Sequence, residues 1–225
     1  MKNIVAIIPA RGGSKGLLGK NVVNFSGQPL LSWTVQQAKN SKYVNSVYVS
    51  SDDDEILSIS EHYGAKKIKR PANISGDFAT SESCLLHFLE QIGNIDVVLF
   101  LQATSPLRET KDIDEAIEKF IEGNYDSMFS ATKLEDFFIW TIKNGQPKSY
   151  NYDYRNRKRR QDISDQVVEN GSFYLFKPEM LHENFNRLGG NIGFHLMEDW
   201  KIHEIDNKED LMLCEFIFKQ KGLGK

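Results

Sequence analysis

Short apolar runs alternate with amphipathic helical patterns up to residue 132, and this alternation restricts the fold more than any other feature of the chain. Strands separated by helices form βαβ units, whose strands pair in parallel. The sequence therefore predicts an α/β fold with a mostly parallel sheet. The predicted strands are 4–8, 46–51, 65–68, 96–101 and 127–132, and the predicted helices are 29–39, 55–63, 80–91 and 112–122.

The alternation stops at residues 133–166, which are polar, aromatic and heavily charged, with a short basic run at Arg155 and 157–160. A connection of this length is unusual inside a compact domain. A disordered surface loop is the alternative, but the many aromatic side chains argue against it. We therefore expect a single domain over 1–225, in which 133–166 is an inserted arm that packs on a second copy of the protein. Further strands are predicted at 172–177, 192–197 and 201–205, and a last helix at 207–219.

The composition excludes several classes of protein. The formal net charge of the 225 residues is −3, so no overall basic field favours nucleic acid. No apolar stretch approaches the length of a membrane span, and the first residues do not resemble a signal peptide. Cys84 and Cys214 lie far apart in apolar, helix-like stretches, which favours two buried thiols in a reducing cytosol. We expect a cytoplasmic protein that binds neither nucleic acid nor a membrane.

A glycine-rich loop, residues 10–21, follows the first predicted strand and carries the cations Arg11, Lys15 and Lys20. Glycine lets backbone N–H groups approach an anion, and the cations neutralise phosphate charge. The loop matches neither the P-loop pattern, because Asn21 stands where Ser or Thr is needed, nor the dinucleotide-binding pattern. It therefore indicates a polyphosphate site of another type. An ordinary strand-to-helix turn with solvated cations is the alternative.

Three more polar clusters, 50–54, 102–108 and 204–206, come at the carboxyl ends of predicted strands. Ligands of open α/β sheets bind beyond these ends. The acidic residues 52–54 are expected to cap the helix that follows them. Glu204 and Asp206 are two residues apart, which puts both carboxylates on one face of a strand and suits Mg²⁺. The alternative for this pair is a solvated strand edge in which Asp206 is the N-cap of the last helix.

The order of motifs resembles that of the sialic acid cytidylyltransferases, also called CMP-sialic acid synthetases or acylneuraminate cytidylyltransferases. The resemblance covers about residues 3–220. It is carried by the opening motif IPARGGSKG at 8–16, IKRP at 68–71 with DFATS at 77–81, LQATSPLR at 101–108, and RRQD at 159–162 leading to ENGSFY at 169–174.

The resemblance implies a three-layer, Rossmann-like nucleotidyltransferase fold and the transfer of CMP from CTP to a nonulosonic acid, with release of pyrophosphate. It implies a homodimer, a Mg²⁺ (or Mn²⁺) ion held by Glu204 and Asp206, and Arg11, Lys15 and Asp206 as catalytic residues. The positions that match CTP-binding residues are Arg11, Gly12, Ser14, Lys15, Lys20, Asn21, Arg70 and Ser81, and those that match the sugar-acid site are Gln102, Arg160 and Gln161.

The chain departs from the family pattern at two positions that bear on the reaction. The family usually has Asp-x-Asp at the metal, whereas this chain has Glu204-Ile205-Asp206. No lysine is carried over to the sugar site, because the corresponding neighbourhood reads Phe-Phe-Ile-Trp at 137–140. The predicted acceptor is a sialic acid-type nonulosonic acid, N-acetylneuraminate or a relative, and the alternatives are legionaminic, pseudaminic, deaminoneuraminic and 3-deoxy-manno-octulosonic acid. A catalytically silent nucleotide-binding module is the alternative of another class.

Overall fold

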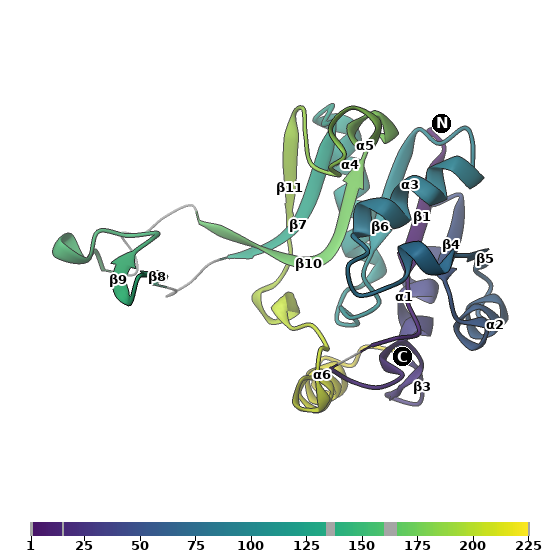
Figure 1. The fold of residues 1–225 in the computed structure, drawn as a ribbon, viewed down its shortest axis with the longest axis horizontal. Coiled ribbons are helices and arrows are strands. Elements are labelled where there is room, and N and C mark those ends of the chain that lie inside the picture. Colours follow the sequence, from purple (N-terminus) through teal and green to yellow (C-terminus); the bar gives the residue numbers. More distant parts are fainter. Residues whose placement is uncertain (1, 15, 134–137, 160–165, 225) are drawn as a thin grey trace.

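A computed structural model of the chain describes residues 2–14, 16–133, 138–159 and 166–224, and its centre is a seven-stranded sheet (Figure 1). The sheet has the order β11-β7-β10-β6-β1-β4-β5, and every pair of neighbours is parallel except the two that involve β10. The predicted α/β class with a mostly parallel sheet is therefore confirmed. The strands are β1 Ile4–Pro9, β4 Ser46–Ser51, β5 Lys66–Lys69, β6 Val97–Leu101, β7 Ser127–Lys133, β10 Val167–Phe176 and β11 Ile192–Leu196.

Helices cover both faces of the sheet because its central strands are apolar on both faces. In β1, Ile4, Ala6 and Ile8 join one core cluster, whereas Val5 and Ile7 join another. The first cluster contains side chains of α1, α2 and α4, and the second contains those of α3 and α5, which gives three layers. The helices are α1 Leu30–Lys39, α2 Asp54–His62, α3 Ser81–Gln91, α4 Thr110–Glu122, α5 Pro178–Asn184 and α6 Lys208–Gln220. No helix in the described part of the chain is long and apolar enough to cross a membrane.

A third, smaller cluster connects the end of the chain to its beginning. Phe218 of α6 packs on Phe25 of the short hairpin β2 Asn24–Phe25 and β3 Gln28–Pro29, with ring centroids 5.1 Å apart. Ile205, which is fully buried, belongs to the same cluster. The packing places the segment before α6 against the glycine-rich loop.

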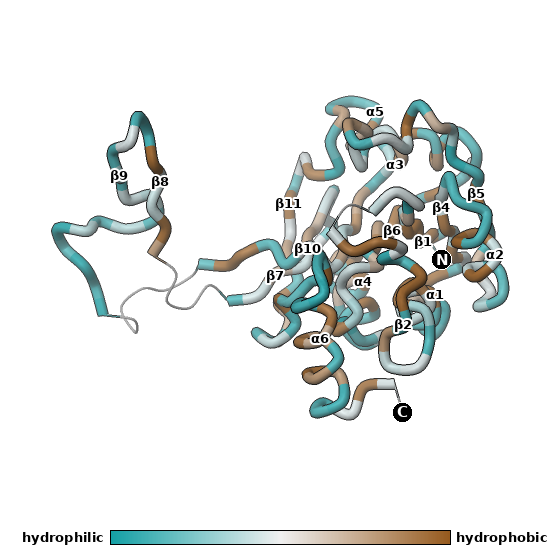
Figure 2. Tube along the Cα trace, turned by 60° about the horizontal axis from the view of Figure 1, so that its bottom comes forward, coloured by the Kyte–Doolittle hydropathy of each residue, from teal (hydrophilic) through white to brown (hydrophobic). Residues whose placement is uncertain are grey.

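The segment 133–166 contains a hairpin that projects away from the sheet (Figures 1 and 2). Its strands are β8 Trp140–Lys143 and β9 Gln146–Ser149, joined by Asn144 and Gly145, both with positive φ. Asn-Gly is the preferred pair for such a tight turn. Trp140 contacts the rings of Tyr152 and Tyr154, so the aromatic residues pack partly on one another.

The predicted strand at 201–205 is wrong. Residues Asp199–Ile202 form a short 3-10 helix, η5, and 203–205 pair with no strand. The reason is that the buried Lys201 side chain forms ion pairs with Glu109 and Asp112, while the Ile205 N–H donates to the Thr104 carbonyl at 2.8 Å. Asp206 is not the N-cap of the last helix either, because Asn207 holds that place.

Candidate active site

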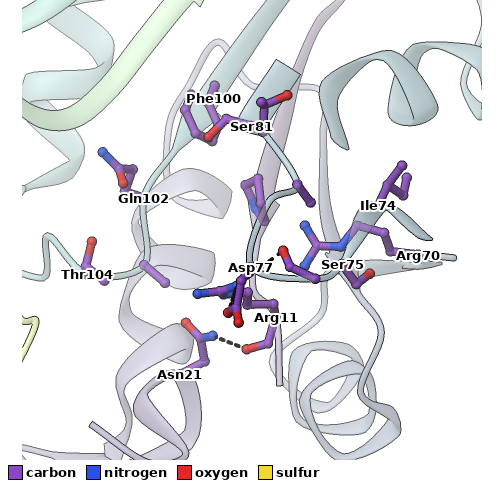
Figure 3. A pocket seen from close by; sticks show the side chains of 15 residues that line it. Arg11, Asn21, Arg70, Ile74, Ser75, Asp77, Ser81, Phe100, Gln102 and Thr104 are labelled. Carbon is purple, nitrogen blue, oxygen red and sulfur yellow. Dashed lines mark hydrogen bonds and ion pairs between the residues drawn. The ribbon is translucent and has the colours of Figure 1, made fainter. Parts of the chain in front are cut away.

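A cleft opens at the carboxyl ends of β1 and β6, between the glycine-rich loop and the loop that precedes α3 (Figure 3). Five of the residues expected at the site line it, and they come from four separate stretches of the chain. These residues are Arg11, Asn21, Arg70, Ser81 and Gln102. Parallel strands end at the same edge of the sheet, which is why residues so distant in sequence converge here.

The glycine-rich loop is anchored to the end of β4. The backbone N–H of Gly12 donates to Asp52 Oδ1 at 3.1 Å, and the side chain of Asn21 donates to the carbonyl of Arg11 at 2.9 Å. A Cβ at position 12 would lie 2.8 Å from Asp53 Oδ2, so this close approach needs glycine. Asp53 also caps α2, as expected for 52–54, by accepting from the N–H of Glu55 and Ile56. Ser14, half-buried, lies in the same loop.

Arg11 reaches across the cleft to the opposite loop. Its guanidinium donates to Asp77 Oδ1 at 3.2 Å and to the Gly76 carbonyl at 3.4 Å (Figure 3). More than a third of each charged side chain is exposed, so the contact is open to competition by another anion.

Arg70 is buried in the wall of the cleft with donors left over. Only 7% of it is exposed, and its Nε and one terminal nitrogen find no hydrogen-bond acceptor among the described residues. Asp52 Oδ1 lies 3.8 Å away, which is an ion pair without a hydrogen bond. Leaving charged donors unsatisfied in a buried position is costly, so the position suits a ligand that brings acceptors.

The two acidic residues before α6 stand in different surroundings. Asp206 is exposed and accepts from Lys20 Nζ at 2.9 Å, which ties it to the glycine-rich loop. Glu204 is largely buried, and that burial, together with the charge of Asp206, raises its pKa from 4.5 to about 7. Lys20 and Arg108 oppose the rise.

This pair fits a divalent cation in part. The described residues contain no group of three or more His, Cys, Asp or Glu that could hold a metal. The charge of Asp206 raises the pKa of Glu204, so the two carboxylates are nevertheless a donor set whose repulsion a cation would relieve. The remaining ligands of such an ion would come from water and from phosphate oxygens, which is how Mg²⁺ is commonly held.

Gln102 and Glu204 meet at Gly171 of β10. The side-chain amide of Gln102 donates to the Gly171 carbonyl, and its backbone N–H donates to Ser172 at 3.1 Å. Gly171 has φ +67°, and a Cβ there would collide with the carboxylate of Glu204. The expected sugar-acid residue Gln102 and the buried member of the acidic pair, Glu204, are therefore neighbours.

Three expected site residues, Lys15, Arg160 and Gln161, lie outside the described residues. Sequence reasoning in turn missed Asp77 and Thr104, which line the cleft, although both belong to motifs that it quoted. It also missed Arg187, which bonds to Glu82 and lies 4.3 Å over the ring of Tyr174 beside the cleft wall. Arg187 comes from an irregular stretch, and no sequence signal marked it.

The sequence model of the cytidylyltransferase family matches residues 5–220 of this chain. The chain belongs to that family. It is 34% identical over 217 residues to N-acylneuraminate cytidylyltransferase A of Danio rerio, and the match covers 95% of this chain. It is also 33% identical over 231 residues to pseudaminic acid cytidylyltransferase of Campylobacter jejuni, where 97% of both chains is covered.

The relatives differ in length. This cytidylyltransferase-family chain spans about half the length of the fish relatives, and nearly the whole length of the Campylobacter ones. Among solved structures, a CMP:2-keto-3-deoxy-manno-octonic acid synthetase complexed with CTP superposes with a TM-score of 0.75 at 17% identity, covering 98% of this chain and all of the other. At that identity the likeness shows the fold, which is that of a nucleotidyltransferase.

Proposed function

We propose that this chain transfers CMP from CTP to the anomeric hydroxyl of a nonulosonic acid of the sialic acid type and releases pyrophosphate. The observation that carries the proposal is the cleft itself. It brings Arg11 and Asn21 of the glycine-rich loop together with the unsatisfied, buried Arg70 and with Gln102, whose neighbour across Gly171 is Glu204. Relatives whose names give these activities support it.

CTP is proposed to bind along the glycine-rich loop. Arg11, Lys15 and Lys20 would neutralise the triphosphate, Gly12 would let it approach the backbone closely, and the Ser14 hydroxyl would donate to it. Arg11 would exchange Asp77 for a phosphate oxygen, because a triphosphate brings more charge than one exposed carboxylate. Further along the cleft, the cytidine would take Asn21, Ser81 and the free donors of Arg70.

The reaction is proposed to be an attack of the anomeric oxygen on the α-phosphorus, with pyrophosphate leaving. Holding the two substrates in line and stabilising phosphate charge supply most of the acceleration in such transfers. A Mg²⁺ or Mn²⁺ ion held by Glu204 and Asp206 would supply Lewis-acid charge at the phosphates and lower the pKa of the attacking hydroxyl. Arg11 and Lys15 would stabilise the charge that develops on the leaving group.

The sugar acid is proposed to lie beyond Gln102, with Arg160 on its carboxylate and Gln161 beside it. An Arg160→Ala variant should then raise the KM for the sugar acid by tenfold or more while the KM for CTP stays within twofold, because a guanidinium–carboxylate pair is lost from one substrate only. An increase confined to CTP would reject this role.

A homodimer in the cytoplasm is also proposed, with the arm 133–166 packing on the second copy. Support comes from the projecting hairpin, whose Ile142 is 77% exposed, since an apolar side chain left in water at that position suits an interface. The two cysteines are free and buried, in keeping with a reducing compartment.

The deciding experiment measures pyrophosphate release with CTP, Mg²⁺ and a panel of N-acetylneuraminic, deaminoneuraminic, legionaminic, pseudaminic and 3-deoxy-manno-octulosonic acids. We expect release with at least one nine-carbon acid, and CMP-sugar formation in equal amount. Release with the eight-carbon acid alone would change the substrate class. CTP binding without release for any acid would replace the enzyme by a nucleotide-binding module.

A further inference from the structure

Lys201 is fully buried three residues before Glu204, and the proposed reaction gives it no part. Its ammonium nitrogen lies 2.8 Å from Asp112 Oδ2, 2.8 Å from Glu109 Oε2 and 2.6 Å from Glu198 Oε2. An ammonium group has three N–H bonds, and three carboxylates surround it. Asp112 is as buried as the lysine, whereas Glu109 and Glu198 are partly exposed.

Two of the three partners of Lys201 lie at the start of α4, the helix that follows a loop lining the cleft. Glu109 and Asp112 make up the capping box of α4, in which the Glu109 N–H donates to Asp112 at 2.7 Å. The loop directly before this helix contains Gln102 and Thr104, which line the cleft. Lys201 therefore connects the segment 198–206 to the element that carries the proposed sugar-acid residue.

A second tie lies on the other side of Glu204. The Ile205 N–H donates to the Thr104 carbonyl at 2.8 Å, and the Ile205 side chain is fully buried. The two ties, at Lys201 and at Ile205, enclose the short stretch that holds Glu204. Because this stretch pairs with no strand, sheet hydrogen bonds do not set its register.

Burial of so many charges is weak evidence of a contribution to stability, since apolar side chains of similar size often serve at least as well. An ion cluster contributes geometric specificity instead. Its donors and acceptors pair in one relative placement of the two segments, whereas apolar groups can pack in several. Lys111, half-exposed, contacts Glu109 and Glu198 from outside at 3.3 and 3.2 Å, which helps to balance the charge.

We propose that Lys201 is a positioning residue: its contacts to Asp112 and Glu109 fix the register of segment 198–206 on α4, with Glu198 orienting the ammonium group from within the segment, and thereby fix the places of Glu204 and Asp206 for the cation and CTP. The inference rests on the proposed metal role of that pair. Lys201 itself touches neither substrate. It acts by holding two carboxylates where they can share one ion with the triphosphate.

The test compares Lys201→Met with the double variant Lys201→Met/Asp112→Asn. The single variant leaves the buried Asp112 carboxylate without its cation, whereas the double variant removes that charge as well. The side-chain oxygen of the introduced asparagine would still accept from the Glu109 N–H. Two quantities are measured: the Tm, and the Mn²⁺ concentration that half-saturates the protein in the presence of CTP, followed by electron paramagnetic resonance. Neither needs turnover. Lys111→Met, which leaves the buried contacts in place, and Lys177→Met, which removes a lysine–aspartate pair of 2.7 Å at the other end of the sheet, are the controls.

We expect the double variant to recover most of the Tm lost by the single one, while both weaken Mn²⁺ binding by tenfold or more and the two controls stay within twofold of the wild type. A double variant that recovers both quantities would reduce Lys201 to a structural residue and overturn the proposal. So would an unchanged affinity in the single variant.

Glu198→Gln covers the case in which neither Lys201 variant folds, because Glu198 is partly exposed and its replacement removes one of the contacts. This variant should shift the half-saturation by about threefold with little change in Tm, and an unchanged affinity there would also overturn the proposal. If the wild type transfers CMP and binds Mn²⁺, but the variants bind Mn²⁺ as tightly as the wild type, the role of Lys201 is rejected while the proposed function stands.

Discussion

At the scale of single residues, the cleft combines groups that cost stability with groups that would bind. Arg70 keeps buried donors unsatisfied, and Glu204 is held where its charge is disfavoured. Residues that are strained or unpaired in this way tend to gather at functional sites. Because these groups lower stability but favour binding, a substitution of Glu204 or of Arg70 is expected to change stability and binding in different directions.

Replacement of Glu204 by Gln should stabilise the protein at pH 8 in the absence of divalent cations. The folded state raises the pKa of Glu204 from 4.5 to about 7, so its favourable contribution is complete below pH 4.5 and is lost as the pH rises through 7. The variant should gain on the order of 2 kcal/mol over the wild type at pH 8 and almost nothing at pH 4.5. Urea unfolding at both pH values with EDTA measures this.

The exposed Glu209 in the first turn of α6 supplies the control, since a carboxylate at a helix N-terminus is favourable and Glu209→Gln should bring no gain in stability at pH 8. Equal effects of Glu204→Gln at both would show that burial does not hold the proton on Glu204.

Replacement of Arg70 by Met should weaken CTP binding without loss of stability. The methionine fills similar space and removes a buried charge whose donors have no acceptor. We expect the Kd for CTP, measured by calorimetry, to rise at least tenfold, and the Tm to stay equal or increase. A lower Tm with unchanged CTP affinity would mean that Arg70 supports the fold instead of the ligand.

At the scale of elements, the position of Gly171 in β10 decides how closely strand and acidic segment approach. The register of β10 against β7 shifts between Glu169 and Tyr174, and Gly171 lies inside that irregular stretch with φ +67°. Such bulges commonly redirect side chains beside active sites. Here the bulge brings a carbonyl to Gln102 and leaves room for Glu204.

Gly171→Ala should abolish turnover as well as destabilise the protein. The new methyl group would collide with the Glu204 carboxylate, in addition to the strain of a positive φ. Gly145→Ala is a matched control: its φ is +75° and a methyl group there meets nothing within 4 Å. We expect kcat/KM to fall by at least 100-fold in the first variant and to change less than twofold in the second. Similar losses in both would assign the effect to backbone strain.

The elements that sequence could predict are those whose apolar pattern matches their final environment. Ile4–Ile8 is a continuous apolar run and becomes a strand buried on both faces. The stretch 201–205 also contains two apolar residues, Ile202 and Ile205, but its burial has other causes: a charged cluster around Lys201 and one backbone hydrogen bond. Asp112 is 89 residues from Lys201 in sequence, and Thr104 is still farther from Ile205, so the local pattern carried no sign of these partners.

The site divides along the same line. The positions of Arg11, Asn21 and Gln102 around one cleft follow from motifs at the ends of strands, whereas those of Arg70 and Ser81 were predicted from the family resemblance. Their partners do not: the contact of Arg11 with Asp77 and that of Gly12 with Asp52 depend on how two loops settle against each other. The sequence therefore indicated which residues line the cleft, and the structure showed which of their hydrogen-bond donors lack an acceptor.

At the scale of the whole molecule, a compact three-layer body carries a hairpin that lies away from it (Figure 1). An isolated two-stranded hairpin is at best marginally stable in water. The exposed side chains of Trp140, Ile142 and Tyr150 would therefore gain most from a surface supplied by another copy.

Ile142→Asp should convert a dimer into a monomer at micromolar concentration, since a charge would be forced into an apolar contact. Sedimentation equilibrium of the variant and the wild type measures this. Met212→Asp on α6, where the methionine is 64% exposed, is the control and should leave the dimer intact. A monomeric wild type would remove the proposed role of the arm, and loss of the dimer in both variants would move the interface.

The contact between Lys20 and Asp206 joins positions 186 residues apart. During synthesis the chain emerges from its first residue onward, at a rate of roughly 5–20 residues per second. The loop that would grip the triphosphate is thus exposed to the cell many seconds before its acidic counterpart leaves the ribosome. A nascent or prematurely terminated chain therefore lacks the proposed metal-binding pair, and we expect no transfer of CMP until the last helix has docked.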